Sequence, residues 1–242
     1  MTSTVAAVLF DVDGTLVDHQ SASDAAVVEM LQACPTSSPV GLKRVISRWN
    51  ELQDWAMERY LAGELTFAEQ RRVRVKRFVG ELGTGTWSDR QADAWFSRYL
   101  DRYEAAWDVY EDVPPALAAL TAEHAGLRLG VITNGDADQQ RRKLRRTGLA
   151  DLLDHFTASS EAGVAKPDPR IFVTACTRLG LCADQVVYVG DRLGTDTEAA
   201  IAAGLRGVWL DRERGTVSTS VPRVESLTSL LPLLNRLPGK DS

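Results

Sequence analysis

The chain has 242 residues, 44% of them hydrophobic and 25% charged, with a formal net charge of −5. This composition excludes a disordered, collagen-like or disulfide-stapled chain, and the negative charge gives no support for a nucleic-acid partner. The longest apolar run, residues 5–10, is too short to span a membrane, and no Lys or Arg precedes it as in a secretory signal. The three cysteines, Cys34, Cys176 and Cys182, form no metal-type C-x-x-C pair and fit a reducing compartment. We therefore expect a cytoplasmic protein without a membrane partner.

Short apolar runs that end at a turn predict the buried strands of a parallel sheet. They cover residues 5–10, 127–133, 185–189 and 207–210. Helices are expected between the later strands, because capping residues open these segments and a glycine closes each of them. The opening signals are Asp136 with Gln139, Asp168 with Pro169, and Thr195 with Glu198; the closing glycines are Gly148, Gly180 and Gly204. This alternation predicts an α/β fold with a doubly wound, Rossmann-like parallel sheet.

The segment from about residue 20 to residue 111 differs, because it contains no convincing buried strand. It holds five of the six tryptophans, and a capping box at Thr66 and Glu69 opens a helix. We predict a helical insert with its own small core, so that residues 1–18 and 112–242 form the α/β core and residues 19–111 form a helical cap. The alternative is a set of extra helices packed flat on one face of the sheet. Residues 215–222 are expected to form a surface loop, and residues 225–237 a closing helix bent near Pro232.

Polar residues follow the first two predicted strands, at the sheet edge where ligands bind in open α/β folds. Asp11 and Asp13 come directly after the first strand, and Gly14 permits a sharp turn there. Two adjacent carboxylates repel each other unless a cation or a proton lies between them, although Asp-Gly alone is also a common turn. Thr133 and Asn134 follow the second strand, where a hydroxyl, an amide and free backbone N–H groups suit phosphate oxygens.

Two further clusters come later in the chain. Lys166 lies in a Lys-Pro-Asp-Pro turn into a helix; a lone lysine is usually solvated, but the two prolines favour a directed role. Asp191 ends a predicted buried strand and Asp196 opens the next helix. Carboxylate oxygens are the ligands that Mg²⁺ prefers. Helix N-capping would explain Asp196 well and Asp191 poorly.

Together, these four clusters resemble the motifs of the haloacid dehalogenase-like hydrolase superfamily, in the expected order and strand–loop setting. The helical insert resembles the C1 cap of subfamily I. The Thr-Asn-Gly and Lys-Pro-Asp-Pro forms are most similar to the branch of small-molecule phosphatases that includes pyrimidine 5′-nucleotidases and N-acylneuraminate-9-phosphatases.

The resemblance implies a role for each motif residue. Asp11 would be the nucleophile that forms an aspartyl-phosphate, and Asp13 would be the general acid and base. Mg²⁺ would be held by Asp11, the backbone carbonyl of Asp13, Asp191 and, directly or indirectly, Asp196. Thr133, Asn134 and Lys166 would hold the phosphoryl oxygens. The cofactor expected is therefore Mg²⁺, and the partner a small phosphorylated metabolite of the nucleotide or sugar phosphate type.

Three other activities remain open on the same scaffold. A haloacid dehalogenase would lack the second aspartate, because a halide leaves without a proton. A phosphomutase would need a cap that excludes water, and a non-catalytic binding module would have lost an acidic motif residue. The state is expected to be a monomer or a homodimer.

Within the insert, Arg71 lies near the axis of the apolar stripe of the helix that follows Thr66. An acidic partner within the insert is one explanation, and a role in substrate specificity is the other. Arg74, Lys76 and Arg77 are predicted to be solvated. His19, at the entrance to the insert, is an exposed hinge residue or a gate to the site.

Overall fold

The structure is a computed structural model that describes residues 4–32 and 41–236. The chain divides into two compact units, Met1–Asp18 with Asp108–Ser242, and His19–Trp107. Residues 108–111, which were predicted to belong to the insert, lie in the first unit.

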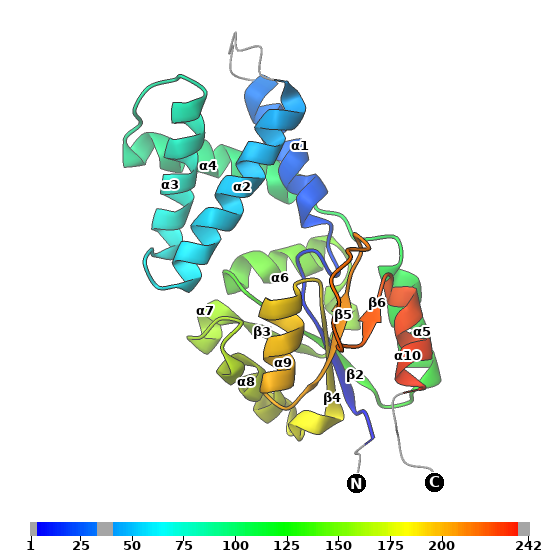
Figure 1. The fold of residues 1–242 in the computed structure, drawn as a ribbon. Helices are drawn as coiled ribbons and strands as arrows, with labels where there is room; N and C mark the ends of the chain where they lie inside the picture. Colours follow the sequence, from blue (N-terminus) through cyan, green and yellow to red (C-terminus); the bar gives the residue numbers. More distant parts are fainter. Residues whose placement is uncertain (1–3, 33–40, 237–242) are drawn as a thin grey trace. The chain divides into compact units, whose positions relative to one another are not determined.

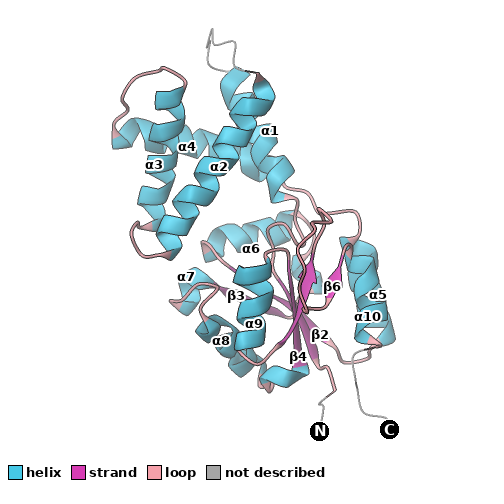
Figure 2. Ribbon diagram, in the orientation of Figure 1, coloured by secondary structure: helices cyan, strands magenta, loops and turns pink. Residues whose placement is uncertain are grey.

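The first unit is built on a six-stranded sheet in the order β3-β2-β1-β4-β5-β6, with every neighbouring pair parallel. Figures 1 and 2 show helices on both sides of this sheet, with α8 and α9 on one side and α5 and α10 on the other. The predicted α/β fold with a doubly wound parallel sheet is therefore confirmed. The strands are β1 (Ala7–Phe10), β2 (Arg128–Thr133), β3 (His155–Ala158), β4 (Val186–Gly190), β5 (Arg206–Leu210) and β6 (Arg223–Val224).

The order places β1 between β2 and β4, so β2 and β3 lie on one side of β1 and β4, β5 and β6 lie on the other. Phe10, the last residue of β1, lies in register with Val131 of β2 and Val189 of β4. The residues that follow these three strands therefore meet at one edge, which is where open α/β sheets bind ligands.

Strands β3 and β6 were not predicted, and both lack the continuous apolar run that marks the central strands. β3 begins with His155 and Phe156, and β6 has only two residues. Each flanks the sheet at its edge, where fewer neighbours bury the side chains and the sequence pattern is correspondingly weaker.

The helices of the first unit cover the sheet through apolar faces. Ile171 and Phe172 of α8 and Ala200 of α9 pack with Leu9 and Tyr188 of the sheet in one buried cluster. The α-helices are α5 (Val113–Glu123), α6 (Ala137–Arg146), α7 (Ser159–Ala162), α8 (Pro169–Leu179), α9 (Ala199–Ala202) and α10 (Leu230–Leu234). Single 3-10 turns cover Ala150–Leu152, Ala183–Gln185 and Leu227–Ser229.

Most of the residues predicted to begin or end a helix do so in the structure. The Asp136 side chain accepts a hydrogen bond from the backbone N–H of Gln139 and caps α6. Asp168 caps α8 ahead of Pro169, and Gly180 ends that helix in the left-handed conformation. The signal at Thr195 and Glu198 was wrong, because Leu193–Glu198 forms a π-helical segment that no side chain caps.

The closing segment is shorter than the predicted helix over residues 225–237, whose last residue lies outside the described part of the chain. A 3-10 turn precedes α10, and Pro232 lies in the first turn of α10. In that position its missing N–H removes no intrahelical hydrogen bond, so it causes no bend. Residues 215–222 form no helix or strand, as expected of a loop.

In the described residues of the second unit, four helices surround an aromatic core: α1 (His19–Gln32), α2 (Leu42–Leu61), α3 (Phe67–Glu81) and α4 (Asp89–Ala105). Trp49 is fully buried, and its ring centroid lies 5.0 Å from Phe78, 5.2 Å from Trp95 and 4.8 Å from Tyr99. Thr66 and Glu69 form the predicted capping box of α3.

The prediction that Arg74 is solvated was wrong, because its side chain is buried. Its guanidinium lies 4.4 Å from the Trp49 ring centroid, and Nη1 donates to Oε1 of Gln53 at 2.8 Å. Residues i and i+4 share a helix face, so Arg74 lies on the same side of α3 as the buried Phe78.

Across the described part of the chain, no helix combines the length and the apolar character that a membrane crossing requires. Cys176 is buried and Cys182 is exposed, both as free thiols. Cys34 lies outside the described residues.

Candidate active site

The chain turns sharply at the end of β1, directly after which come the two carboxylates Asp11 and Asp13. The backbone N–H of Asp11 still bonds the carbonyl of Val189 in β4 at 2.9 Å, and the N–H of Leu16 already bonds the carbonyl of Val12 at 2.9 Å. Gly14 has φ +89°, and a Cβ there would lie 2.5 Å from Oδ2 of Asp191. Glycine is therefore required at this position by both the backbone conformation and the close approach of Asp191.

Three carboxylates converge beside this turn. Asp11, Asp191 and Asp196 each present an oxygen, and these oxygens lie within 4.8 Å of one another. Asp196 reaches the group because Gly190, the last residue of β4, has no side chain: a Cβ there would lie 2.4 Å from Cβ of Asp196. Oγ1 of Thr15 donates to Oδ1 of Asp191 at 3.3 Å, and the backbone N–H of Arg192 donates to Oδ2 of Asp196 at 3.0 Å.

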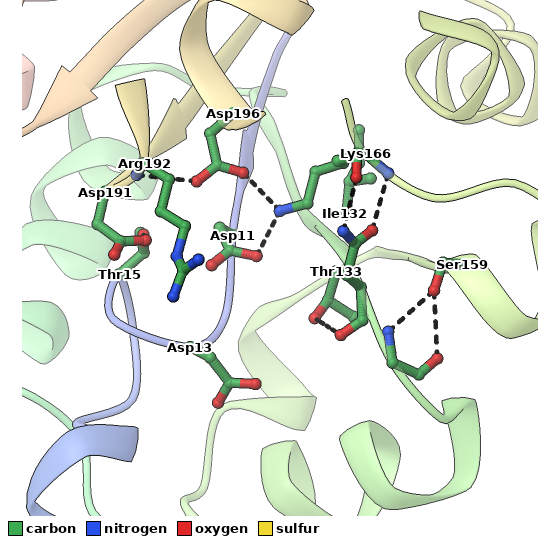
Figure 3. Close-up of polar contacts among 12 residues, drawn as sticks. Asp11, Asp13, Thr15, Ile132, Thr133, Ser159, Lys166, Asp191, Arg192 and Asp196 are labelled. Carbon is green, nitrogen blue, oxygen red and sulfur yellow. Dashed lines mark hydrogen bonds and ion pairs between the residues drawn. The ribbon is translucent and has the colours of Figure 1, made fainter. Parts of the chain in front are cut away.

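Lys166 is buried against two of these carboxylates (Figure 3). Its Nζ donates to Oδ1 of Asp11 at 2.6 Å, to Oδ1 of Asp196 at 2.6 Å and to the hydroxyl of Tyr188 at 2.8 Å. The Tyr188 hydroxyl in turn donates to the carbonyl of Ile132 at 3.0 Å. All three N–H groups of the ammonium are thus used, which fixes Lys166 and one oxygen of Asp11.

Burial and mutual repulsion both disfavour the charged forms of the site's carboxylates. Burial raises the pKa of Asp11 to about 8, with Asp196 and Asp191 acting in the same direction and Lys166 opposing them. Burial, followed by Asp196, raises the pKa of Asp191 to about 6. Although burial opposes the charged form, Asp11 and Asp196 raise the pKa of Lys166 above its usual range. One lysine therefore does not neutralise the three carboxylates.

The end of β2 forms the opposite side of the site. Thr133 is buried, and its Oγ1 lies 3.4 Å from the carbonyl of Asn134. The Asn134 amide braces the loop that carries Lys166: Nδ2 donates to the Lys166 carbonyl and Oδ1 accepts from the Lys166 N–H, both at 2.8 Å. Its predicted contact with phosphate stays a prediction.

The backbone N–H groups expected to be free at this turn already have partners. The N–H of Gly135 donates to Oγ of Ser159, and that of Ala137 donates to Oγ of Ser160, both at 2.9 Å. The start of α6 is therefore held by the start of α7, and Figure 3 shows the Ser159 contact.

Asp13 has different surroundings from Asp11. Figure 3 shows its side chain apart from the group formed by Lys166, Asp11 and Asp196. Nε2 of Gln140 donates to its Oδ2 at 2.8 Å, and Nζ of Lys143 forms an ion pair with its Oδ1. The Asp13 side chain keeps 26% of its surface exposed, so a reacting group can reach it.

The structure thus brings seven of the predicted site residues from four loops to one edge of the sheet: Asp11, Asp13, Thr133, Asn134, Lys166, Asp191 and Asp196. Arg71 and His19 belong to the second unit, where the Arg71 guanidinium lies 4.3 Å from the Phe67 ring centroid and His19 begins α1. Their roles in specificity stay predictions.

Sequence reasoning missed Tyr188, Gln140 and Lys143. The signal for Tyr188 was present, because a tyrosine inside a buried strand needs a hydrogen-bond partner for its hydroxyl. Gln140 and Lys143 lie in a strongly polar helix, where nothing in the pattern marks the inward-facing side chains.

The donor set fits a hard divalent cation. Three carboxylates with oxygens within 4.8 Å, two of them with a raised pKa, are the ligands that Mg²⁺ prefers and the charge that it would offset. Asp191 and Asp11 are the better placed ligands, because both oxygens of Asp196 already accept from Lys166 and Arg192.

Comparison with known proteins agrees with this geometry. The family model for haloacid dehalogenase-like hydrolases matches residues 5–204. The chain is 32% identical to the glyceraldehyde 3-phosphate phosphatase of Methanopyrus kandleri, over 86% of this chain and 88% of the relative. It is 37% identical to the phosphoserine phosphatase of Thermus thermophilus, over 74% of this chain and 68% of that enzyme. With the human N-acylneuraminate-9-phosphatase it shares 28% identity, over 99% and 98% of the two chains.

Solved structures show the same fold. The HAD-hydrolase YfnB from Bacillus subtilis, bound to magnesium, covers 96% of this chain with a TM-score of 0.83 at 21% identity, and all of YfnB is covered. The 2-haloacid dehalogenase from Pseudomonas syringae covers 96% with a TM-score of 0.66 at 28% identity, and 99% of that chain is covered.

The chain belongs to the haloacid dehalogenase-like hydrolase family. Together with its phosphatase relatives, this makes it an enzyme of the phosphoric monoester hydrolase class.

Proposed function

We propose that the enzyme hydrolyses a small-molecule phosphate monoester, with Mg²⁺, through an aspartyl-phosphate on Asp11. The observation that carries this proposal is the pairing of two carboxylates with opposite surroundings. Asp11 is buried and held at Oδ1 by Lys166, and no donor among the described residues bonds its Oδ2. Asp13 is partly exposed and held by α6. One carboxylate is thereby prepared for attack and the other for proton transfer.

In the first half-reaction, Oδ2 of Asp11 attacks phosphorus and the bond between phosphorus and the ester oxygen breaks. Asp13 gives its proton to that oxygen, and the alcohol leaves. In the second half-reaction, Asp13 takes a proton from a water molecule whose oxygen attacks phosphorus. The bond between phosphorus and Asp11 breaks, inorganic phosphate leaves, and both side chains return to their starting states.

Lys166 acts through its charge and by fixing Asp11. Its three N–H groups already bond Asp11, Asp196 and Tyr188, so it lowers the repulsion between the carboxylates and the incoming phosphoryl group. Thr133, at the end of β2, supplies a hydroxyl donor for a phosphoryl oxygen.

Asp11 and Asp191, with the backbone carbonyl of Asp13, would hold Mg²⁺, and Asp196 would complete the site directly or through its contact with Lys166. When bound, the cation supplies positive charge beside the phosphoryl group.

The same residues argue against the other activities. A dehalogenase has no use for a general acid at Asp13, and a binding module has no reason to retain all four acidic motif residues. A phosphomutase uses the same residues, and only a bisphosphate substrate would separate it from a phosphatase.

The substrate test is phosphate release from a panel of phosphorylated metabolites with Mg²⁺, including glyceraldehyde 3-phosphate, phosphoserine, N-acylneuraminate 9-phosphate, nucleoside monophosphates and sugar phosphates. We expect release from at least one nucleotide or sugar phosphate. Asp11→Asn, which removes the nucleophile with almost no change in volume, should abolish release and retain the fold by circular dichroism.

A 2-haloacid is the comparison arm of the same assay. Halide release without phosphate release, or phosphate release that survives Asp11→Asn, would contradict the proposed function.

A further inference from the structure

Two side chains of α6 contact the carboxylate of Asp13, one at each oxygen. Nε2 of Gln140 donates to Oδ2 at 2.8 Å, and Nζ of Lys143 pairs with Oδ1. Gln140 and Lys143 are three residues apart, so they lie on the same face of the helix. Both side chains are buried: Gln140 is 4% exposed, and the Lys143 side chain is 1% exposed.

Burial of the charged Lys143 side chain is not an effective way to stabilise the fold. Among the cations of α6, Arg141 pairs with Glu161 at the surface and Arg145 is exposed, whereas Lys143 is withdrawn from water. A buried ion pair stabilises a protein less than well-packed apolar side chains of the same volume. The position of Lys143 is therefore better explained by what it does to Asp13 than by packing.

The positions of Gln140 and Lys143 depend on the same turn that carries the Thr133 hydroxyl, the group proposed to bind a phosphoryl oxygen. Thr133 ends β2 and Asp136 caps α6 three residues later. Gly135, at φ +137°, lies in the turn, and a Cβ there would lie 3.5 Å from Nε2 of Gln140. The hydroxyls of Ser159 and Ser160 hold the backbone of this turn. The position of the Asp13 carboxyl is thus tied to that of Thr133.

We propose that Gln140 and Lys143 are positioning residues that hold the Asp13 carboxyl where it meets the leaving oxygen. This inference rests on the proposed function, because it assigns a reason to the placement of the general acid. As the proton passes from Asp13 to the ester oxygen, negative charge develops on the Asp13 carboxylate, and the fixed ammonium of Lys143 stabilises that charge without having to reorganise. Gln140 fixes the rotation of the carboxyl by bonding the other oxygen.

The test compares two leaving groups in variants of the full chain. Gln140→Met keeps the side-chain length, Lys143→Met shortens the side chain by one atom, and both substitutions remove the polar contact. The substrates are a sugar phosphate, whose alkoxide must be protonated, and p-nitrophenyl phosphate, whose leaving group departs without a proton. The measured quantity is kcat/KM, which reports the steps up to departure of the leaving group.

We expect Lys143→Met to lower kcat/KM for the sugar phosphate at least about tenfold more than for p-nitrophenyl phosphate, which is part of the roughly hundredfold or larger contribution of a well-placed general acid. Gln140→Met should show the same preference with a smaller loss, and Lys143→Arg should restore part of it. Arg145→Met removes a cation from the same helix at an exposed position and should leave both substrates unchanged.

Equal losses on the two substrates would overturn the inference, because a merely structural role would not distinguish leaving groups. A crystal structure of each variant gives a second readout that does not depend on turnover. A displaced Asp13 carboxyl in Lys143→Met and Gln140→Met supports the inference, and an unmoved carboxyl in both contradicts it.

If the unaltered enzyme released phosphate from no member of the metabolite panel, the proposed function would fail, while the crystal structures would still decide whether the two residues position Asp13.

Discussion

Asp11 and Asp13 are two residues apart and yet lie in opposite environments. Asp11 is buried beside Lys166, Asp191 and Asp196, and its pKa is raised to about 8 mainly by that burial. Asp13 is partly exposed and is held by α6 from the other side. The sharp turn after β1 separates the two side chains, so one loop supplies both a nucleophile and a general acid.

Asp13→Ala should separate phosphatase from dehalogenase chemistry. Loss of the leaving-group acid should lower the turnover of a natural-type phosphate monoester at least about a hundredfold. The loss on p-nitrophenyl phosphate should be smaller, because nitrophenolate leaves easily. The measurement is phosphate release from both substrates, and equal losses would assign Asp13 to hydrolysis of the intermediate or to the metal site instead.

Gly14→Ala tests the close approach between the β1 turn and Asp191. The substitution adds a Cβ 2.5 Å from Oδ2 of Asp191 and strains a backbone at φ +89°. We expect Mg²⁺ affinity to fall at least about tenfold, since one displaced carboxylate ligand costs on the order of 1.4 kcal/mol or more. Titration of activity against Mg²⁺ concentration measures this change.

Gly148→Ala is the matched control, because Gly148 has φ +72° and nothing lies within 4 Å of an added Cβ. It should cost about 1–2 kcal/mol of stability from the backbone alone and leave Mg²⁺ affinity unchanged. Unchanged affinity in Gly14→Ala would mean that Asp191 does not bind the cation.

At the scale of elements, the site depends on strands whose sequences are unambiguous. β1, β2, β4 and β5 are continuous buried runs, so their order along the chain and the polar residues after them were predictable. β3 and β6 were missed because short edge strands carry mixed side chains. The contacts of Lys143 and Gln140 with Asp13 could not be predicted either. These residues lie more than 120 positions from Asp13 in the sequence, and only the order of the strands in the sheet brings them close to it.

A second set of contacts ties the segment after the insert to the end of the chain. Asp112, the residue before α5, accepts hydrogen bonds from both Nη atoms of Arg212 at 3.0 Å, from Oγ of Ser226 and from the N–H of Leu227 at 2.8 Å. Nη2 of Arg212 also donates to the carbonyl of Thr15 in the active-site turn. Burial raises the pKa of Asp112, but the hydrogen bonds from Arg212, Leu227 and Ser226 outweigh it, and the pKa lies below its usual value.

Asp112→Asn should lower the free energy of unfolding by about 1–2 kcal/mol at pH 7, because bonds to a charged acceptor are stronger than bonds to a neutral amide. A carboxyl with a lowered folded-state pKa stabilises the protein above its unfolded pKa, and this stability is lost as the pH falls through the folded-state value. The difference between the two proteins should therefore shrink below a pH of roughly 4.

Urea unfolding at a series of pH values measures this difference. Glu161→Gln breaks a surface pair with Arg141, whose side chains are 37% and 39% exposed, and should change stability little at any pH. A cost for Asp112→Asn that stays constant down to acid pH would contradict an electrostatic role.

At the scale of the whole molecule, the chemistry and the aromatic core belong to different units. The carboxylates, Lys166 and Thr133 all come from the first unit, whereas five of the six tryptophans lie in the second. The division into a sheet and a helical insert followed from this contrast in sequence. The substrate could not be predicted in the same way, because specificity depends on side chains such as Arg71. No sequence periodicity encodes which groups surround such a side chain.

Removal of the metal should therefore lower both the stability of the first unit and the activity. Mg²⁺ bound between Asp11 and Asp191 would offset the burial, and the repulsion that adds to it, which together raise their pKa values. Binding to the folded state alone adds about 2.7 kcal/mol of stability at a concentration one hundred times the dissociation constant. We expect Mg²⁺ to raise the temperature of the unfolding transition in calorimetry of the full chain, and EDTA to reverse the shift and abolish phosphate release. Ca²⁺ should raise the unfolding temperature too but support little turnover, because its larger and more flexible coordination misplaces the attacking carboxylate. Full activity of a metal-stripped sample, or an unfolding temperature indifferent to both cations, would show that the three carboxylates do not form a metal site.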